Sequence, residues 1–301
     1  MNIDRLIETS GELIKHFRVA DSQNLRLKDF DPNDTLDFTS EDKPRAKETL
    51  AAGVQALAKL QEILYAQNRW AVLVIFQGMD TAGKDSVIKH VMSGVNPQGC
   101  EVHSFKAPSR EELDHDYLWR CAKRLPSRGV IGLFNRSYYE ETLVVRVHPE
   151  LLEKQKLPAE LLTKNIWKER FQDIRRFERY LMHNGIAVRK FFLHLSKKEQ
   201  KKRFLERIDK PEKDWRISAN DVHEREHWQD YMEAYEDAIR HTATDEAPWY
   251  IVPADNKWFT HLIVAAALVD LLASLDLKYP KLSKQELDQL DEAKKVLLTV
   301  K

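Results

Sequence analysis

Cysteine is scarce in this chain of 301 residues, which contains only Cys100 and Cys121. Two cysteines cannot build a disulfide framework or a zinc site of paired cysteine motifs, so we expect both to be reduced, partly buried thiols. An excess of charge of one sign is also missing, because 48 Lys and Arg residues balance 48 Asp and Glu residues. The net charge therefore predicts no partner, and binding a polyanion would require a local concentration of basic residues.

Long apolar runs are absent as well. Residues 1–10 lack the apolar core of a signal peptide, and the most apolar stretch, residues 262–275, is interrupted by Asp270 and too short to span a bilayer. We interpret this stretch as a buried helix and expect a cytoplasmic setting. There is no internal repeat and no low-complexity tract. The 301 residues are enough for one large α/β domain or two small ones, and the 43% of hydrophobic residues allows a sizeable core.

Short apolar runs alternate with helical stretches through most of the chain. The run at 71–76 is continuous and rich in β-branched residues, as expected of a strand buried on both faces. Similar runs predict strands at 102–105, 130–134, 186–195 and 249–252. Helices are expected at 44–67, 86–92, 111–124 and 158–183, and an acidic, extended surface segment at 29–42. The alternation predicts an α/β fold with a mostly parallel sheet of about five strands, covered on both faces.

The strand at 71–76 leads directly into the pattern G-x-x-x-x-G-K, which is typical of a phosphate-binding P-loop. Gly78 and Gly83 allow positive φ values and a close approach of the backbone, while Lys84 adds a mobile positive charge. The intervening residues and the first turn of the next helix are expected to bind phosphate through converging amides. These residues are Met79, Asp80, Thr81, Ala82, Asp85 and Ser86.

One residue departs from the usual P-loop pattern. Asp85 follows Lys84, where a Ser or Thr usually binds Mg²⁺. Metal coordination must therefore be arranged differently, and Asp80 is the acid best placed to supply it, because Mg²⁺ prefers hard oxygen ligands. An acid among phosphates would repel its ligand unless a metal or a proton intervened, so we predict that Asp80 binds the metal.

The strand at 130–134 ends in Asn135 and Arg136, at the edge of a parallel sheet where functional residues gather. Asn135 stands about where ordinary P-loop proteins place a metal-organising Asp. Arg136 can pair with phosphoryl oxygens in a bidentate way, with a surface ion pair as the alternative. We interpret the tyrosines that follow, Tyr138 and Tyr139, as packing residues.

A basic segment follows the strand at 186–195. Residues 186–216 contain eleven Lys or Arg and five Asp or Glu, a local excess of six in a neutral chain. Arg203 and Arg207 share one face of a helix that Ser196 can cap. Considered alone, such a segment is as often a solvated helix face as a functional one. Its position after a strand end favours a mobile lid that carries arginines to the transferring phosphoryl group.

Residues 78–85, 135–140 and 198–204, in this order, together resemble the type-2 polyphosphate kinase family, as do 117–120 and 256–259. The resemblance extends over about residues 15–280 and implies a P-loop kinase fold of the thymidylate-kinase type, with a helical lid. We therefore expect a three-layer α/β/α arrangement. The expected boundaries are an N-terminal extension at 1–43, a phosphotransferase domain at 44–280 with its lid at about 196–225, and a C-terminal helix at 281–301.

The resemblance also implies Mg²⁺-dependent transfer of phosphoryl groups between polyphosphate and nucleotides. Many relatives have Asp at the position of Asn135, and the Asn form resembles class III members, which phosphorylate both nucleoside monophosphates and diphosphates. The catalytic residues implied by the resemblance are Asp80, Lys84, Arg136 and Arg203. Further phosphate- or nucleotide-binding residues are Asn135, Glu140, Arg146 and Arg207.

We therefore expect reversible phosphoryl transfer from inorganic polyphosphate to AMP and ADP, yielding ADP and ATP. The alternative is an ATP-dependent nucleotide kinase of the thymidylate-kinase type, against which Asn135 and the surplus of lid cations argue. A non-enzymatic polyphosphate-binding regulator is a second alternative. We expect adenine nucleotides and polyphosphate as partners, assembly into a homo-oligomer, and no binding to nucleic acid or membranes.

Overall fold

The computed structural model of the protein describes residues 3–20, 24–210 and 219–299. Within them, six strands form one sheet in the order β1-β6-β5-β2-β4-β3. All neighbouring strands are parallel except β1 and β6, which are antiparallel. The strands are β1 (Arg18–Val19), β2 (Ala71–Gln77), β3 (Cys100–Ser104), β4 (Ile131–Asn135), β5 (Ile186–His194) and β6 (Trp249–Pro253).

The predicted α/β fold with a mostly parallel sheet is confirmed. The five expected strands are present, with ends that differ from the prediction by one or two residues. The sixth strand, β1, was not predicted, because two residues are too short to show any alternation of apolar and polar side chains. It pairs Arg18 with Tyr250 and Val19 with Trp249 at the edge of the sheet.

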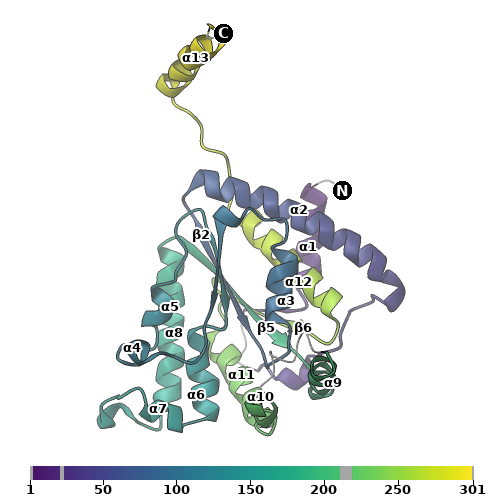
Figure 1. Cartoon of the computed structure of the whole chain (residues 1–301), viewed down its shortest axis with the longest axis vertical. Helices are drawn as coiled ribbons and strands as arrows, with labels where there is room; N and C mark the ends of the chain where they lie inside the picture. The colour runs from purple at the N-terminus through teal and green to yellow at the C-terminus, as the bar shows by residue number, and fades with distance from the viewer. Residues whose placement is uncertain (1–2, 21–23, 211–218, 300–301) are drawn as a thin grey trace.

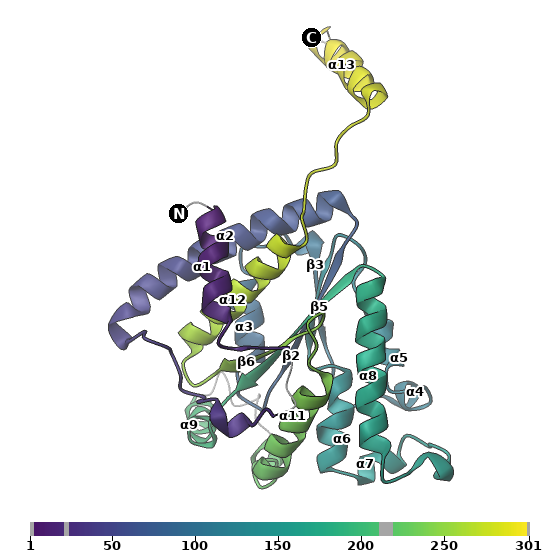
Figure 2. The same ribbon diagram turned by 180° about the vertical axis from the view of Figure 1, so that it is seen from behind.

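Helices cover both faces of the sheet and give the expected three layers (Figures 1 and 2). One face carries α1 (Ile3–Ile14), α2 (Lys43–Gln67), α3 (Lys84–Val91) and α12 (Lys257–Ser274). The other face carries α8 (Ile166–His183) and α11 (Trp228–Thr242), with the short helices α4 (Arg110–Leu113), α5 (Trp119–Ala122), α6 (Val144–Val147) and α7 (Glu150–Glu153).

The central strand β2 shows how the sequence produces these layers. All of its residues are buried, and their side chains alternate between the two faces. Val72 and Val74 join the core beneath α2 and α12, whereas Leu73 and Ile75 join the core beneath α8 and α11. A continuous apolar run is therefore required, because neither face of this strand meets water.

Helix α12 contains the most apolar stretch of the chain. By length and composition it is the one helix, among the described residues, that could cross a membrane. Its side chains from Phe259 to Val269 are buried between the sheet and the helices α1 and α2. The expectation of a buried helix at 262–275 is confirmed.

Two predicted helices are wrong in extent. In place of a helix at 111–124 the chain forms α4 and α5, separated by a turn in which the Asp116 carboxylate accepts the Leu118 N–H at 3.0 Å. Such local side-chain bonds compete with the helical ladder. The helix expected at 158–183 begins only at Ile166, after a 3₁₀ turn (Ala159–Leu161) and a Thr163 hydroxyl that accepts the Asn165 N–H.

The remaining segments lie around this framework. Residues 29–42 are irregular apart from the end of one 3₁₀ turn (Leu27–Asp29) and a second 3₁₀ turn (Ser40–Asp42), and none of their six acids is buried. The expected lid contains α9 (Lys197–Ile208) and α10 (Ala219–His223), while residues 211–218 of it lie outside the described residues. Helix α13 (Lys284–Thr299) projects away from the body of the protein and buries no residue (Figure 1).

Candidate functional site

The predicted P-loop connects β2 to α3 at the carboxyl edge of the parallel sheet. Gly78 has φ 153° and Gly83 has φ 108°, values that favour glycine. A Cβ at Gly78 would lie 2.9 Å from the Leu193 carbonyl oxygen, so the loop can pass β5 only without a side chain there. Glycine is therefore favoured at the two positions for different reasons. Gly78 has both a positive φ and a close approach to β5, whereas Gly83 has a positive φ alone.

Lys84 lies folded back over the loop. Its ammonium donates hydrogen bonds to the carbonyl oxygens of Gly78 at 2.7 Å and Met79 at 3.4 Å, and the side chain is only 8% exposed. Burial, followed by the nearby Arg136 guanidinium, lowers the pKa of Lys84 to about 8, against the opposing effect of Asp80, Glu140 and Asp85. The charge of this lysine is thus held by carbonyls that an arriving phosphate can replace.

Arg136 lies directly beside the loop. Its guanidinium is 2.8 Å from Asp80 Oδ1 and 3.5 Å from Glu140 Oε2. The carboxylate of Glu140, followed by that of Asp80, raises the pKa of Arg136, while burial raises the pKa of Glu140. Arg136, Asp80, Glu140 and Lys84 thus form one cluster in which two cations balance two acids.

Asn135 and Asp85 are joined across the site. The Asn135 side-chain amide donates to Asp85 Oδ1 at 2.5 Å, and so ties the end of β4 to the first turn of α3. An ordinary P-loop has a hydroxyl after the lysine and an Asp at the second strand end. Here the acid follows the lysine and the neutral side chain ends the strand. The two departures noted in the sequence, Asp85 after the lysine and Asn135 at the strand end, are therefore linked, because these two side chains bond to each other.

Arg203 lies behind the P-loop, and this placement differs from the expected one. Its guanidinium is 3% exposed and donates to the carbonyl oxygens of Thr81 at 3.0 Å and Ala82 at 3.3 Å. It also donates to the carbonyls of Ala254 and Asp255, at 2.6 and 3.0 Å. With these bonds to backbone carbonyls, Arg203 joins the P-loop to the β6–α12 turn.

A second residue of α9 reinforces this connection. Gln200 donates to the Asp80 carbonyl at 3.0 Å, and Arg225, just after α10, donates to Gln200 Oε1 at 2.5 Å. Thr81 has φ 66°, a left-handed value that is costly for a non-glycine residue and persists only where surrounding contacts fix it. Gln200 and Arg203 bond to the carbonyls on either side of this bend, so helix α9 holds the loop in its curved form.

The other expected residues lie further from the cluster or bond to different partners. Arg146 forms an ion pair with Asp237 of α11 at 2.7 Å. Arg207 lies one turn after Arg203 on α9 and is partly buried. The Ser86 hydroxyl is 3.2 Å from His261 Nε2, whose pKa is lowered to about 4 by burial and then by His90. His261 is therefore neutral at pH 7.

Two residues of the site were missed in the sequence. Gln200 sits within the basic helix but carries no charge, and Tyr235 lies in a helical pattern of aromatic residues that resembles ordinary core. The Tyr235 hydroxyl lies close to the Gly78 backbone, and burial, followed by the Glu140 charge, raises the pKa of this tyrosine. Only the tertiary arrangement brings either residue to the loop.

Tyr138 and Tyr139 are buried, as the packing interpretation predicts. Their hydroxyls also donate to Glu178 Oε1, at 2.9 and 2.8 Å. Glu178 in turn pairs with Lys190 at 2.5 Å, and Lys190 is completely buried. This network, centred on Glu178 and Lys190, anchors the 3₁₀ turn (Tyr138–Thr142) that follows Arg136.

The side chains around the loop include carboxylates that could bind a metal ion. Among the described residues there is no group of three or more His, Cys, Asp or Glu that could hold a metal ion. The acids beside the P-loop are Asp80, Asp85 and Glu140, which offer carboxylate oxygens alone. This donor set fits Mg²⁺, which needs one or two carboxylates when substrate phosphates and waters complete its shell.

Comparisons with a family model, with named relatives and with a solved structure all point to the same family. The family model of polyphosphate kinase 2 matches residues 40–280. The chain is 49% identical over 285 residues to a Rhodopseudomonas palustris protein named ADP-polyphosphate phosphotransferase, covering 94% of this chain and 98% of that one. It is 44% identical over 268 residues to a Meiothermus ruber AMP/ADP-polyphosphate phosphotransferase, covering 89% and 96%. The crystal structure of polyphosphate kinase 2 from Arthrobacter aurescens superposes with a TM-score of 0.83 at 38% identity, covering 93% and 96%.

Proposed function

The chain belongs to the polyphosphate kinase 2 family, and from this membership we propose that it transfers phosphoryl groups from inorganic polyphosphate to AMP and ADP, yielding ADP and ATP. The observation that supports the proposal most directly is the cluster of Lys84 and Arg136 at the mouth of a P-loop. Relatives covering nearly the whole chain are named for this type of reaction. The ATP-dependent alternative has no comparable support.

The chemistry requires positioning and neutralisation more than covalent catalysis, because the transition state of phosphoryl transfer is loose and anionic. The loop amides and Lys84 bind the phosphates at the point of transfer. Arg136 turns from Asp80 toward the transferred group and neutralises its charge. An acceptor phosphate is already ionised, so no general base is needed. Arg203 acts indirectly, by holding the loop in position.

Mg²⁺ is the metal we propose, with Asp80 as its protein ligand. When bound, it supplies charge neutralisation between phosphate oxygens. Asp80 is 30% exposed and is held by Arg136, whose guanidinium leaves it when phosphate arrives. Asp85 is the less favoured alternative, because its carboxylate already accepts a hydrogen bond from Asn135.

The choice between AMP and ADP as acceptor rests on Asn135. Of the two relatives above, one is named for ADP and the other for both AMP and ADP. We propose that both are accepted, as the Asn form of this motif suggests.

We also propose a cytoplasmic setting, the boundaries 1–43, 44–280 and 281–301, and a homo-oligomer. Self-association is supported by exposed leucines of α13, among them Leu287 and Leu290.

The direct test mixes purified protein, Mg²⁺, long-chain polyphosphate and AMP, and measures ADP and ATP by chromatography. We expect both products, formed at a rate that falls as salt rises from about 0.05 to 0.5 M, because salt screens attraction of a polyanion to the basic lid. The parallel reaction uses ATP as the donor to AMP. Equal or faster turnover with ATP at every salt concentration would refute polyphosphate as the donor.

A second prediction tests the metal assignment. Asp80→Asn keeps the shape of the side chain and removes its charge, so we expect a roughly 10- to 100-fold loss of turnover, the cost of a charged contact. We also expect a higher Mg²⁺ requirement and an unchanged melting temperature. The matched comparison is Asp85→Asn, measured over the same Mg²⁺ titration. If Asp85→Asn loses metal dependence while Asp80→Asn behaves as wild type, the assignment is wrong.

A further inference from the structure

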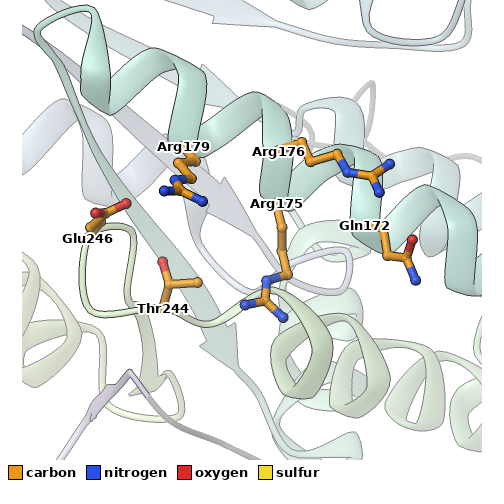
Figure 3. A pocket seen from close by; sticks show the side chains of 6 residues that line it. All are labelled: Gln172, Arg175, Arg176, Arg179, Thr244 and Glu246. Atoms are coloured by element: carbon orange, nitrogen blue, oxygen red, sulfur yellow. The ribbon is translucent and has the colours of Figure 1, made fainter.

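An arginine-lined pocket lies on the side of the protein away from the P-loop. Helix α8 contributes Gln172, Arg175, Arg176 and Arg179, and the loop between α11 and β6 contributes Thr244 and Glu246 (Figure 3). The cavity has a volume of about 410 Å³. The loop precedes the amino end of β6, whereas the P-loop follows the carboxyl end of β2, so the two lie at opposite edges of the sheet.

The charges around this pocket are not balanced. Arg176 is paired with Asp173 at 3.2 Å, but neither Arg175 nor Arg179 forms an ion pair within the part of the chain that the structure describes. Glu246 is the one acid that lines the pocket. Because Arg176 is neutralised by Asp173, Arg175 and Arg179 face the single carboxylate of Glu246, and this excess of positive charge in a chain with no net charge makes a local site for an anion.

The lining side chains indicate which anion fits. Guanidinium groups bind phosphate oxygens in a bidentate way, and Gln172 and Thr244 add neutral hydrogen-bonding groups. No aromatic side chain lines the pocket, so it lacks the aromatic platform on which a nucleobase typically stacks. The chemistry therefore favours a phosphate chain without a base.

Helix α11 gives the distance between this pocket and the site. Tyr235 of α11 lies close to the Gly78 backbone of the P-loop, and Thr244 follows two residues after the helix ends. At a rise of 1.5 Å per residue in the helix, the separation is on the order of 15 Å. A long polyphosphate chain can span this distance, whereas tripolyphosphate is too short to occupy both places.

We propose that the α8 pocket is a second binding site for polyphosphate, which holds a remote segment of the chain whose end reacts at the P-loop. The inference rests on the proposed function, because it assumes a polymeric donor. Binding at two places raises the effective concentration of the chain end near the loop. Affinity for the donor then increases once the chain is long enough to bridge both sites.

The test compares Arg175→Gln/Arg179→Gln with wild type. Both side chains are exposed, so the variant is expected to keep its melting temperature. The KM for long-chain polyphosphate is expected to rise about 5- to 10-fold, with kcat and the KM for ADP unchanged. The inhibition constant of tripolyphosphate against long chains is expected to stay the same, since it binds at the P-loop alone.

The matched control, Arg45→Gln/Lys59→Gln, also removes two exposed positive charges, but from α2 on the opposite face of the sheet. An unchanged KM in the α8 variant, or an equal rise in the control, would overturn the proposal. A weaker effect of tripolyphosphate in the α8 variant would show a separate oligophosphate site and overturn bridging. Calorimetric titration with long polyphosphate gives the same comparison without turnover. Failure of the proposed function would appear instead as an inactive wild type.

Discussion

Replacing Lys84 by alanine is expected to lower turnover about 100- to 1,000-fold, the cost of losing one preorganised donor in a polar active site. The protein is expected to stay folded, because the bonds of Lys84 to other described residues are to loop carbonyls, and burying its charge costs free energy. Steady-state rates with polyphosphate and ADP, together with a thermal unfolding curve, check both statements. The control is Lys89→Ala, an exposed lysine on the same helix. Near-normal turnover in a folded Lys84→Ala protein would remove the P-loop from the mechanism.

The pH dependence of phosphate binding gives an independent test of Lys84. With a pKa of about 8, Lys84 is charged below pH 8 and becomes neutral as the pH rises through that value. A bound phosphate favours the charged form, so binding above pH 8 is expected to take up a proton. Calorimetry of tripolyphosphate binding in buffers of different ionisation enthalpy measures this uptake. In Lys84→Ala the uptake above pH 8 should vanish.

Replacing Glu178 by glutamine is expected to cost about 3–5 kcal/mol of unfolding free energy, because it leaves the charge of Lys190 buried without a counterion. Lys190 is fully buried, pairs with Glu178 at 2.5 Å and donates to the Thr242 carbonyl at 2.8 Å. Burial lowers the pKa of Lys190 and the Glu178 charge opposes that shift. Urea denaturation of the wild type and the variant measures the difference.

The decisive comparison is the double variant Glu178→Gln/Lys190→Met. Removing both charges takes away the desolvation penalty along with the pair, so the double variant is expected to be more stable than Glu178→Gln alone. If the two substitutions instead add, each lowering stability independently, the pair is not an energetic unit. Turnover of the double variant also tests whether this network positions Arg136. Tyr138 and Tyr139, which follow Arg136 in the chain, both donate hydrogen bonds to Glu178.

The sequence predicted the parts of the fold that depend on local pattern. The strand at 71–76 and the loop after it were recognisable, because burial on both faces demands a continuous apolar run and phosphate binding demands the spaced glycines. The helix expected at 111–124 failed because side-chain bonds such as that of Asp116 broke its centre. Strand β1 was missed because pairing over so few residues leaves no pattern to detect.

The site was less predictable than the fold. Sequence alone placed Arg203 on a basic helix and suggested that it reaches the phosphate, yet its neighbours in space are carbonyls of the P-loop and of the β6–α12 turn. Whether an arginine faces backbone or ligand depends on how α9 is oriented against the sheet. In the same way, the bond between Asn135 and Asp85 explained two departures that had appeared unrelated.

The pairing of β1 with β6 has a consequence for how the protein is made. Arg18 emerges from the ribosome early, but its partner Tyr250 and the helix α12 that packs on α1 are synthesised near the end. Until then, the outer edge of β5 has no neighbour and the apolar face of α1 has no core to cover. A growing chain therefore exposes both to solvent and to other chains, and this risk of aggregation ends only when β6 and α12 have been synthesised.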